Sequence, residues 1–308
     1  MRIRELRAEA RNALKGNLMK VALSIFYSLI IPFAFGMIST TIAGLLYQVH
    51  ALLMIVAVVA FVVGGIYLIV YLSYGVTIAV MKISRNEESH YFKDAFSKEN
   101  RKLATSAFGG LVGKLIGWFL LAMFAPIIPF VGVFISIAAM VMCVIESYNY
   151  MLINYLKYDY QDKPVKELLE KSKMMMNGNK AKAMVIPMTL IGWTLLNYIV
   201  TTVISAFFSF IWGPFAMPIW VTILEYVISF FLSSMLTAYL NMINYQLYME
   251  QKPLEIYNDD YLKPETNAKK YIWITIGVLA TVFIIYSIIM YLMISMYMSS
   301  FVFDAYNM

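Results

Sequence analysis

The sequence predicts an all-α membrane protein that crosses the lipid bilayer about seven times. Hydrophobic residues make up 61% of the chain and charged residues only 14%, and the mean hydropathy is +0.72. A soluble globule of 308 residues cannot bury that much apolar surface. Apolar runs of about 20 residues, long enough for a helix to cross the hydrocarbon core, recur along the chain. The expected spans are residues 19–46, 51–81, 104–125, 130–156, 184–210, 219–248 and 271–297.

The basic residues predict the orientation of these spans. Of the 24 Lys and Arg residues, all but Lys114 fall in segments 2–20, 82–102, 157–182 and 252–270, which lie on one side of the predicted membrane. Basic loops remain in the cytoplasm. The N-terminus is therefore expected to be cytoplasmic and the C-terminus, after an odd number of spans, extracytoplasmic. The formal net charge of +6 indicates contact with anionic lipid headgroups, and nucleic acid is not an expected partner.

Three amphipathic segments are expected to lie at the cytosolic interface, each directly before a pair of spans. In each segment apolar residues recur at helical spacing while charged residues occupy the remaining face, which is typical of an interfacial helix. Their defining apolar residues are Leu6 and Leu14 in the first segment, Phe92 and Phe96 in the second, and Leu168 and Leu169 in the third.

Short sequence matches indicate an internal repeat. Ser73-Tyr74 recurs as Ser147-Tyr148, and the sequence LIGW at 115–118 recurs at 190–193, so two landmarks agree on nearly the same period. We interpret the unit as one amphipathic helix followed by one membrane hairpin, present three times in the same orientation. The whole chain, 1–308, is then one membrane domain with repeat units at 1–81, 89–156 and 162–248 and an additional span at 271–297.

Three ionisable residues, Lys114, Glu146 and Glu225, fall inside predicted spans. Charged groups are costly in hydrocarbon, so these residues are candidates for a functional polar site. Lys114 and Glu146 would lie at similar depth in an antiparallel hairpin, and one hypothesis is that they form an ion pair. The alternative is that Lys114 extends to the interface while Glu146 is protonated or hydrogen-bonded by Tyr or Asn neighbours. Glu225 is expected to be neutral and hydrogen-bonded to Tyr or Thr, the alternative being that it lines a cavity open to the outside.

Glycines predict a packing surface on the third span. Gly109, Gly113 and Gly117 are each four residues apart and therefore share one helix face. Small residues at this spacing allow close approach of helices in lipid. The single cysteine, Cys143, excludes a disulfide within the chain. No metal site and no cofactor are expected.

Three motifs resemble a known family. They are LKGN at 14–17, Ser172-Lys173 followed by Gly178-Asn179-Lys180, and LIGW at 190–193. In this order they resemble the bacterial membrane family called domain of unknown function 975, over most of residues 1–250. The resemblance implies a plasma-membrane protein with six spans, and it supplies no catalytic residues. The chain departs from the family pattern at 187–189 and in its seventh span.

The sequence leaves two functions open. An enzyme is not expected, because the intramembrane charges lie on separate spans and form no recognisable set of acid, base, nucleophile or metal ligands. The favoured function is a non-catalytic accessory or protective component of the bacterial envelope, whose partner would be a membrane protein or a second copy of the chain. The alternative is a transporter or exporter of a small molecule, peptide or lipid that uses the intramembrane charges.

Overall fold

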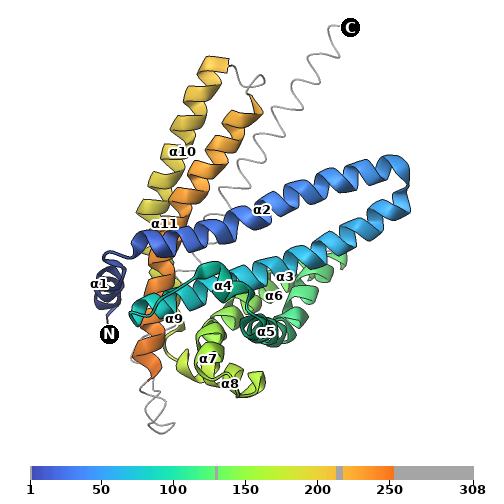
Figure 1. The fold of residues 1–308 in the computed structure, drawn as a ribbon. Coiled ribbons are helices and arrows are strands. Elements are labelled where there is room, and N and C mark those ends of the chain that lie inside the picture. The colour runs from blue at the N-terminus through green and yellow to red at the C-terminus, as the bar shows by residue number, and fades with distance from the viewer. Residues whose placement is uncertain (1, 129–130, 213–217, 253–308) are drawn as a thin grey trace. The chain divides into compact units, whose positions relative to one another are not determined.

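The computed structural model describes residues 2–128, 131–212 and 218–252, and in these residues it contains α-helices and no strand (Figure 1). The all-α prediction is confirmed for this part of the chain. The helices are α1 (Ile3–Leu14), α2 (Leu18–Val49), α3 (Ala51–Ser84), α4 (Tyr91–Phe96), α5 (Lys98–Phe124), the short 3-10 helix η1 (Ala125–Ile127), α6 (Val131–Asn149), α7 (Ile153–Asp159), α8 (Val165–Met175), α9 (Lys180–Met188), α10 (Ile191–Trp212) and α11 (Ile219–Gln251).

Six helical stretches are long and apolar enough to cross a membrane, and they correspond to the first six predicted spans. The protein is therefore a multi-span membrane protein in contact with the lipid bilayer. The predicted seventh span, 271–297, lies outside the described residues. The stretches are Leu18–Val49, Ala51–Ser84, Lys98–Ile127, Val131–Asp159, Lys180–Phe208 and Trp220–Gln251.

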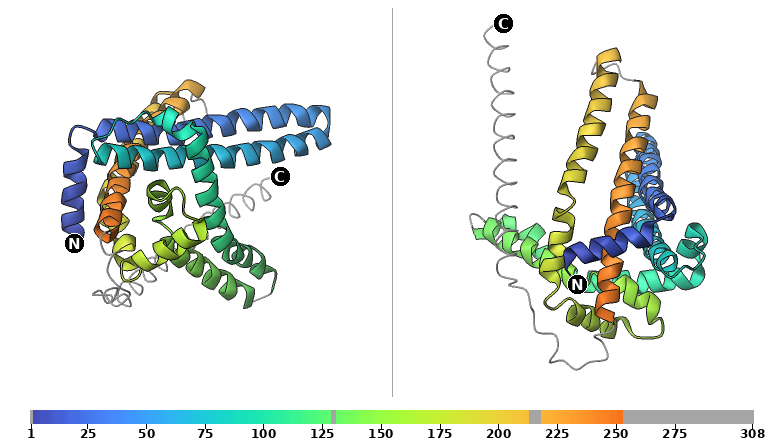
Figure 2. Two further views of the ribbon diagram at one scale, coloured as in Figure 1. Left: turned by 60° about the horizontal axis from the view of Figure 1, so that its bottom comes forward. Right: turned by 90° about the vertical axis from the view of Figure 1, so that its left-hand side faces the viewer.

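Neighbouring spans pack in pairs: α2 against α3, α5 against α6, and α10 against α11. Two views show α2 and α3 side by side along their length (Figure 1, Figure 2). Whether these pairs are copies of one repeated unit stays a prediction. The orientation of the termini across the membrane likewise stays a prediction.

Two glycine turns have the same backbone conformation. Gly16 lies between α1 and α2 with a φ of +81°, and Gly178 lies between α8 and α9 with a φ of +80°. This left-handed conformation ends a helix and suits glycine, because a side chain would clash with the backbone. The sequences LKGN at 14–17 and MNGN at 176–179 thus form the same kind of turn between an amphipathic helix and the helix that follows it.

Two predicted spans are interrupted. Residues 184–210 were expected as one helix, but α9 ends at Met188 and α10 begins at Ile191. Pro187 lies just before the break, and proline both lacks a backbone N–H and crowds the preceding turn. In residues 130–156, α6 ends at Asn149, whose carbonyl accepts a hydrogen bond of 2.9 Å from the Ser172 hydroxyl of α8.

The main apolar core lies where α1, α7 and α8 meet the ends of the longer helices. Fully buried side chains from eight of the described helices contribute to it, among them Leu6, Ile25, Leu72, Leu156, Leu168 and Met242. The most apolar part of α3, in contrast, has no buried residue. An apolar surface of this extent requires lipid.

The apolar faces of α1 and α8 are covered by protein. Leu6, Leu14, Leu168 and Leu169 have exposed fractions between 0% and 4%, because they pack in the protein core. That these helices lie at the cytosolic interface stays a prediction. Phe92 and Phe96 of α4 are 46% and 40% exposed, so α4 does present aromatic side chains outward.

Candidate functional site

Asp159, the last residue of α7, is the centre of a polar cluster that joins three helices. Its Oδ1 accepts a hydrogen bond of 2.7 Å from Arg85 Nη2, directly after α3. Its Oδ2 accepts hydrogen bonds of 2.6 Å from Tyr248 Oη and from Lys252 Nζ, at the end of α11. The Asp159 side chain is only 7% exposed. We call Arg85, Asp159, Tyr248 and Lys252 the Asp159 cluster.

Aromatic rings support the cluster from one side. Arg85 Nε donates a hydrogen bond of 3.3 Å to Tyr245 Oη, and the ring of Tyr155 stacks on Tyr248 with 5.4 Å between centroids. Burial alone would lower the pKa of Arg85, but its hydrogen bonds with Asp159 and Tyr245 raise it above the ordinary value. Arg85 is therefore a permanent cation that holds α3 against α7 and α11.

Three lysines surround the ring of Tyr160, next to the Asp159 cluster. Lys171 Nζ of α8 lies 3.8 Å from the ring centroid, and Lys163 and Lys252 each lie 5.9 Å from it. Cations at such distances are attracted by the negative face of an aromatic ring. Burial, and then repulsion by Lys163, lowers the pKa of Lys171, while burial and the charge of Asp159 raise the pKa of Tyr160. Tyr160 thus links α8 to the cluster.

The arrangement of the Asp159 cluster suits a structural role. Both carboxylate oxygens are engaged by cations or a hydroxyl, so Asp159 has little capacity left to act as a base. Two more ion pairs join helices or their connections nearby: Lys82 with Asp94 at 2.8 Å and Lys182 with Glu250 at 3.2 Å. Among the residues that the structure describes, no group of three or more His, Cys, Asp or Glu could hold a metal ion.

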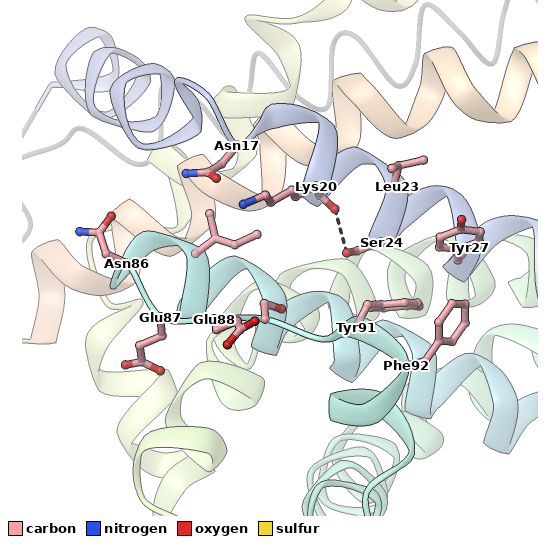
Figure 3. A pocket seen from close by; sticks show the side chains of 12 residues that line it. Asn17, Lys20, Leu23, Ser24, Tyr27, Asn86, Glu87, Glu88, Tyr91 and Phe92 are labelled. Carbon is pink, nitrogen blue, oxygen red and sulfur yellow. Dashed lines mark hydrogen bonds between the residues drawn. The ribbon is translucent and has the colours of Figure 1, made fainter.

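A pocket of about 590 Å³ lies between the first turns of α2 and the connection from α3 to α4 (Figure 3). Lys20 is on one side of the pocket, and Glu87 and Glu88 are on the connection opposite (Figure 3). At the other end the rings of Tyr27 and Tyr91 stack with 6.4 Å between centroids. Both signs of charge line this pocket, so its charge does not identify a ligand.

Lys114 and Glu146 do not form the hypothesised ion pair. Lys114 is exposed on α5, and no carboxylate among the described residues lies within 4.0 Å of its amine. Glu146 Oε2 instead accepts a hydrogen bond of 2.8 Å from Asn149 Nδ2, one turn further along α6. The structure thus agrees with the alternative in which an Asn neighbour hydrogen-bonds Glu146.

Glu225 differs from the favoured expectation. Its Oε1 atom is shielded from solvent and has no hydrogen-bond partner, whereas a bond from Tyr or Thr was expected. The three intramembrane residues lie on α5, α6 and α11, and the structure does not bring them together in a common site.

The glycines of α5 divide into two groups. An added Cβ at Gly109, Gly113 or Gly117 would meet no atom within 4 Å, so these three residues pack against no other helix in the described part of the chain. An added Cβ at Gly110 would overlap Val165 Cγ1 and lie 3.2 Å from Leu169 Cδ1, both on α8. Gly110 is therefore the close-contact glycine that the four-residue spacing did not identify.

Comparison with known proteins gives one match. The searches of curated proteins and of solved structures found none. The family model described as "Protein of unknown function (DUF975)" matches residues 121–211. This region runs from the end of α5 through most of α10 and contains two of the three motifs that carried the resemblance, the turn at Gly178 and the LIGW sequence. Residues 121–211 of this multi-span membrane protein thus match a family of unknown function, the same family that the motifs indicated.

Proposed function

We propose that the protein is a non-catalytic accessory or protective component of the bacterial plasma membrane, which acts by binding another component of the envelope. The observation that carries the proposal is the arrangement of the charged side chains. Those at the ends of α3, α7 and α11 pair with one another, and those within the spans lie apart on separate helices. Such a distribution stabilises a scaffold and supplies no charged route across the membrane.

The proposal includes the predicted topology. Segments 2–20, 82–102, 157–182 and 252–270 face the cytoplasm, and the C-terminus after span 271–297 is extracytoplasmic. The Asp159 cluster would then lie at the cytoplasmic side. The surfaces left for a partner are the lipid-facing sides of the spans and the exposed aromatic residues Phe92 and Phe96 of α4.

One observation favours transport as a second candidate function. Glu225 Oε1 is shielded from solvent without a hydrogen-bond partner, inside a helix that is long enough to span the membrane. An unsatisfied carboxyl group at such a place is a candidate binding group for a proton or a cation.

Reconstitution separates the two functions. Purified protein in liposomes is assayed for flux with a panel of ions, small peptides and lipids, and Glu225→Gln and Glu146→Gln are compared with Glu170→Gln, an exposed position on α8. The accessory function predicts no flux, together with one partner that copurifies through two affinity steps and binds again when purified separately. Substrate-dependent flux that is lost in Glu225→Gln but retained in Glu170→Gln would overturn it in favour of transport.

A further inference from the structure

A groove of about 1010 Å³ lies between α1 and the pair formed by α10 and α11, beside the start of α2. The right-hand view of Figure 2 shows α1 crossing the lower part of this helix pair. The LKGN and LIGW motifs contribute Leu14, Lys15, Gly16 and Trp193 to its lining, and it contains none of the residues of the Asp159 cluster. Its two sides differ in chemistry.

One side of the groove is an apolar wall formed by two facing helices. Trp193, Leu196 and Val200 recur at spacings of three and four residues along α10, and Leu232 and Leu236 do so along α11. Residues at this spacing share one helix face. The three α10 side chains lie in a membrane span and are 61%, 48% and 36% exposed, so no other part of the described chain covers them fully. The wall is thus open and suited to a hydrocarbon chain.

The other side of the groove is cationic. Arg7, Arg11 and Lys15 are four residues apart and form a stripe along α1 and its C-cap, and no Asp or Glu lines the groove. No carboxylate among the described residues lies within 4.0 Å of their side-chain nitrogens. Like charges at this spacing repel one another and destabilise a helix. A bound anion would relieve that repulsion.

Two residues that line the groove each have a side-chain atom without a hydrogen-bond partner. Arg7 Nε and Asn197 Oδ1 are shielded from solvent and have no hydrogen-bond partner. Buried polar atoms are nearly always satisfied in folded proteins, so two unsatisfied atoms in residues that line one groove are consistent with a ligand there. Arg7 is held in place, because Tyr239 Oη of α11 donates a hydrogen bond of 3.0 Å to its backbone carbonyl.

We propose that this groove binds one anionic phospholipid, with its phosphate at Arg7, Arg11 and Lys15 and an acyl chain along the apolar wall. A soluble anion would use the cations and leave the wall empty, and a soluble apolar ligand would leave the cations unpaired. A membrane phospholipid supplies both groups at once, at the depth where a basic amphipathic helix meets a span. The inference goes beyond the proposed function, because it concerns a ligand of the purified protein whatever its role in the envelope.

The first test removes the charges. The full chain is placed in nanodiscs of equal parts phosphatidylglycerol and phosphatidylcholine, and the lipids that remain bound after release are identified by native mass spectrometry. Arg7→Gln, Arg11→Gln and Lys15→Gln are combined in one variant. The control combines Arg4→Gln, Lys166→Gln and Lys173→Gln, which removes the same charge from exposed positions outside the groove.

The wild type and the control are expected to retain one phosphatidylglycerol in preference to phosphatidylcholine, and the groove variant is expected to lose this preference by at least about tenfold. Equal retention of phosphatidylglycerol by the groove variant and the control would overturn the proposal. Since loss of Arg7 could also disturb α1, a second variant leaves all three cations in place.

The second test fills the groove. Leu196→Trp places a larger side chain on the apolar wall, and Leu195→Trp, its neighbour outside the groove, is the matched control. Only Leu196→Trp is expected to lower phosphatidylglycerol retention by at least about tenfold. If both variants retain the lipid, and inorganic phosphate raises the melting temperature as much as phosphatidylglycerol does, the groove binds a free anion and the proposal fails.

The third test identifies the occupant directly. A photo-cross-linking amino acid at position 196 is activated in native membranes, and the purified full chain is analysed by mass spectrometry. An adduct with the mass of an anionic phospholipid is expected. A cross-link to residues 253–308 of the same chain, or to a second copy, would show that protein fills the groove and would overturn the proposal.

Discussion

Charged side chains near the ends of α3, α7 and α11 have partners on other helices, whereas Lys114 and Glu225, further inside the spans, do not. Asp159 is 7% exposed and is bound by two cations and a tyrosine from two other helices. Lys114 is exposed on α5, and Glu225 Oε1 has no hydrogen-bond partner. The same chemical groups thus have opposite surroundings in two regions of one chain.

The difference follows from the cost of removing a charge from water. Arg85 and Lys252 keep side-chain exposures of 29% and 34%, so they retain part of their hydration while they bind Asp159. Ion pairs in such half-buried positions lose less hydration energy than fully buried pairs, and they can therefore favour folding. Within a span no water offsets the cost. The helices of this protein are accordingly held together at one end by polar contacts and a packed core, while their apolar lengths depend on lipid.

The largest loss of stability is expected from placing charged side chains in the apolar core. Leu168→Glu combined with Leu169→Glu places two carboxylates at positions that are 0% and 3% exposed, next to α5. Burying unpaired carboxyl groups is strongly unfavourable, so the free energy of unfolding should fall by more than about 4 kcal/mol. Unfolding in mixed micelles, followed by tryptophan fluorescence, measures the change.

A matched variant tests whether burial is the cause. Met174→Glu with Asn177→Glu adds the same two carboxylates at exposed positions on and directly after α8. This control should unfold close to wild type. Equal destabilisation of the two variants would mean that the net charge of α8, and not the burial of its leucines, determines how strongly α8 packs against the rest of the protein.

A smaller loss is expected from breaking the polar contacts. Asp159→Asn keeps the shape of the side chain but leaves Arg85 and Lys252 without their carboxylate. The free energy of unfolding should fall by roughly 3 kcal/mol, because both cations stay partly buried. Asp162→Asn, an exposed acid three residues further on, is the control and should change little. If the two variants unfold alike, the Asp159 cluster does not hold the helices together.

The sequence was sufficient to predict the membrane spans, because each span is a continuous run of apolar residues. Residues 51–81 are apolar over the required length, and α3 indeed runs from Ala51 to Ser84. The Asp159 cluster has no such signal, since Arg85 and Lys252 are far from Asp159 along the chain. Two acids, Asp159 and Asp162, lie between Lys157 and Lys163, and nothing in the sequence distinguishes the one that binds Arg85 and Lys252.

Periodicity indicates that a helix has an apolar face but not what covers it. Leu168 and Phe92 both lie on apolar faces at helical spacing, yet Leu168 is fully buried and Phe92 is 46% exposed. The covering helix comes from a distant part of the sequence, so tertiary structure decides between protein and lipid. The ion pair of Lys114 and Glu146 failed for a similar reason, because equal depth in a hairpin does not place two side chains on facing sides.

The smallest expected change in the free energy of unfolding comes from substituting single glycines of α5. Gly110→Ala would force its new methyl group onto Val165 and Leu169, so the free energy of unfolding should fall by about 1–3 kcal/mol. Gly113→Ala meets open space, and alanine is the better helix former, so stability should be unchanged or rise by up to about 1 kcal/mol. Because no described residue packs against the predicted glycine seam, we expect it to contact a second copy or another membrane protein. Cross-linking in native membranes tests that contact: Gly113→Ala should weaken association without lowering stability, and unchanged association would leave Gly109, Gly113 and Gly117 with no packing role.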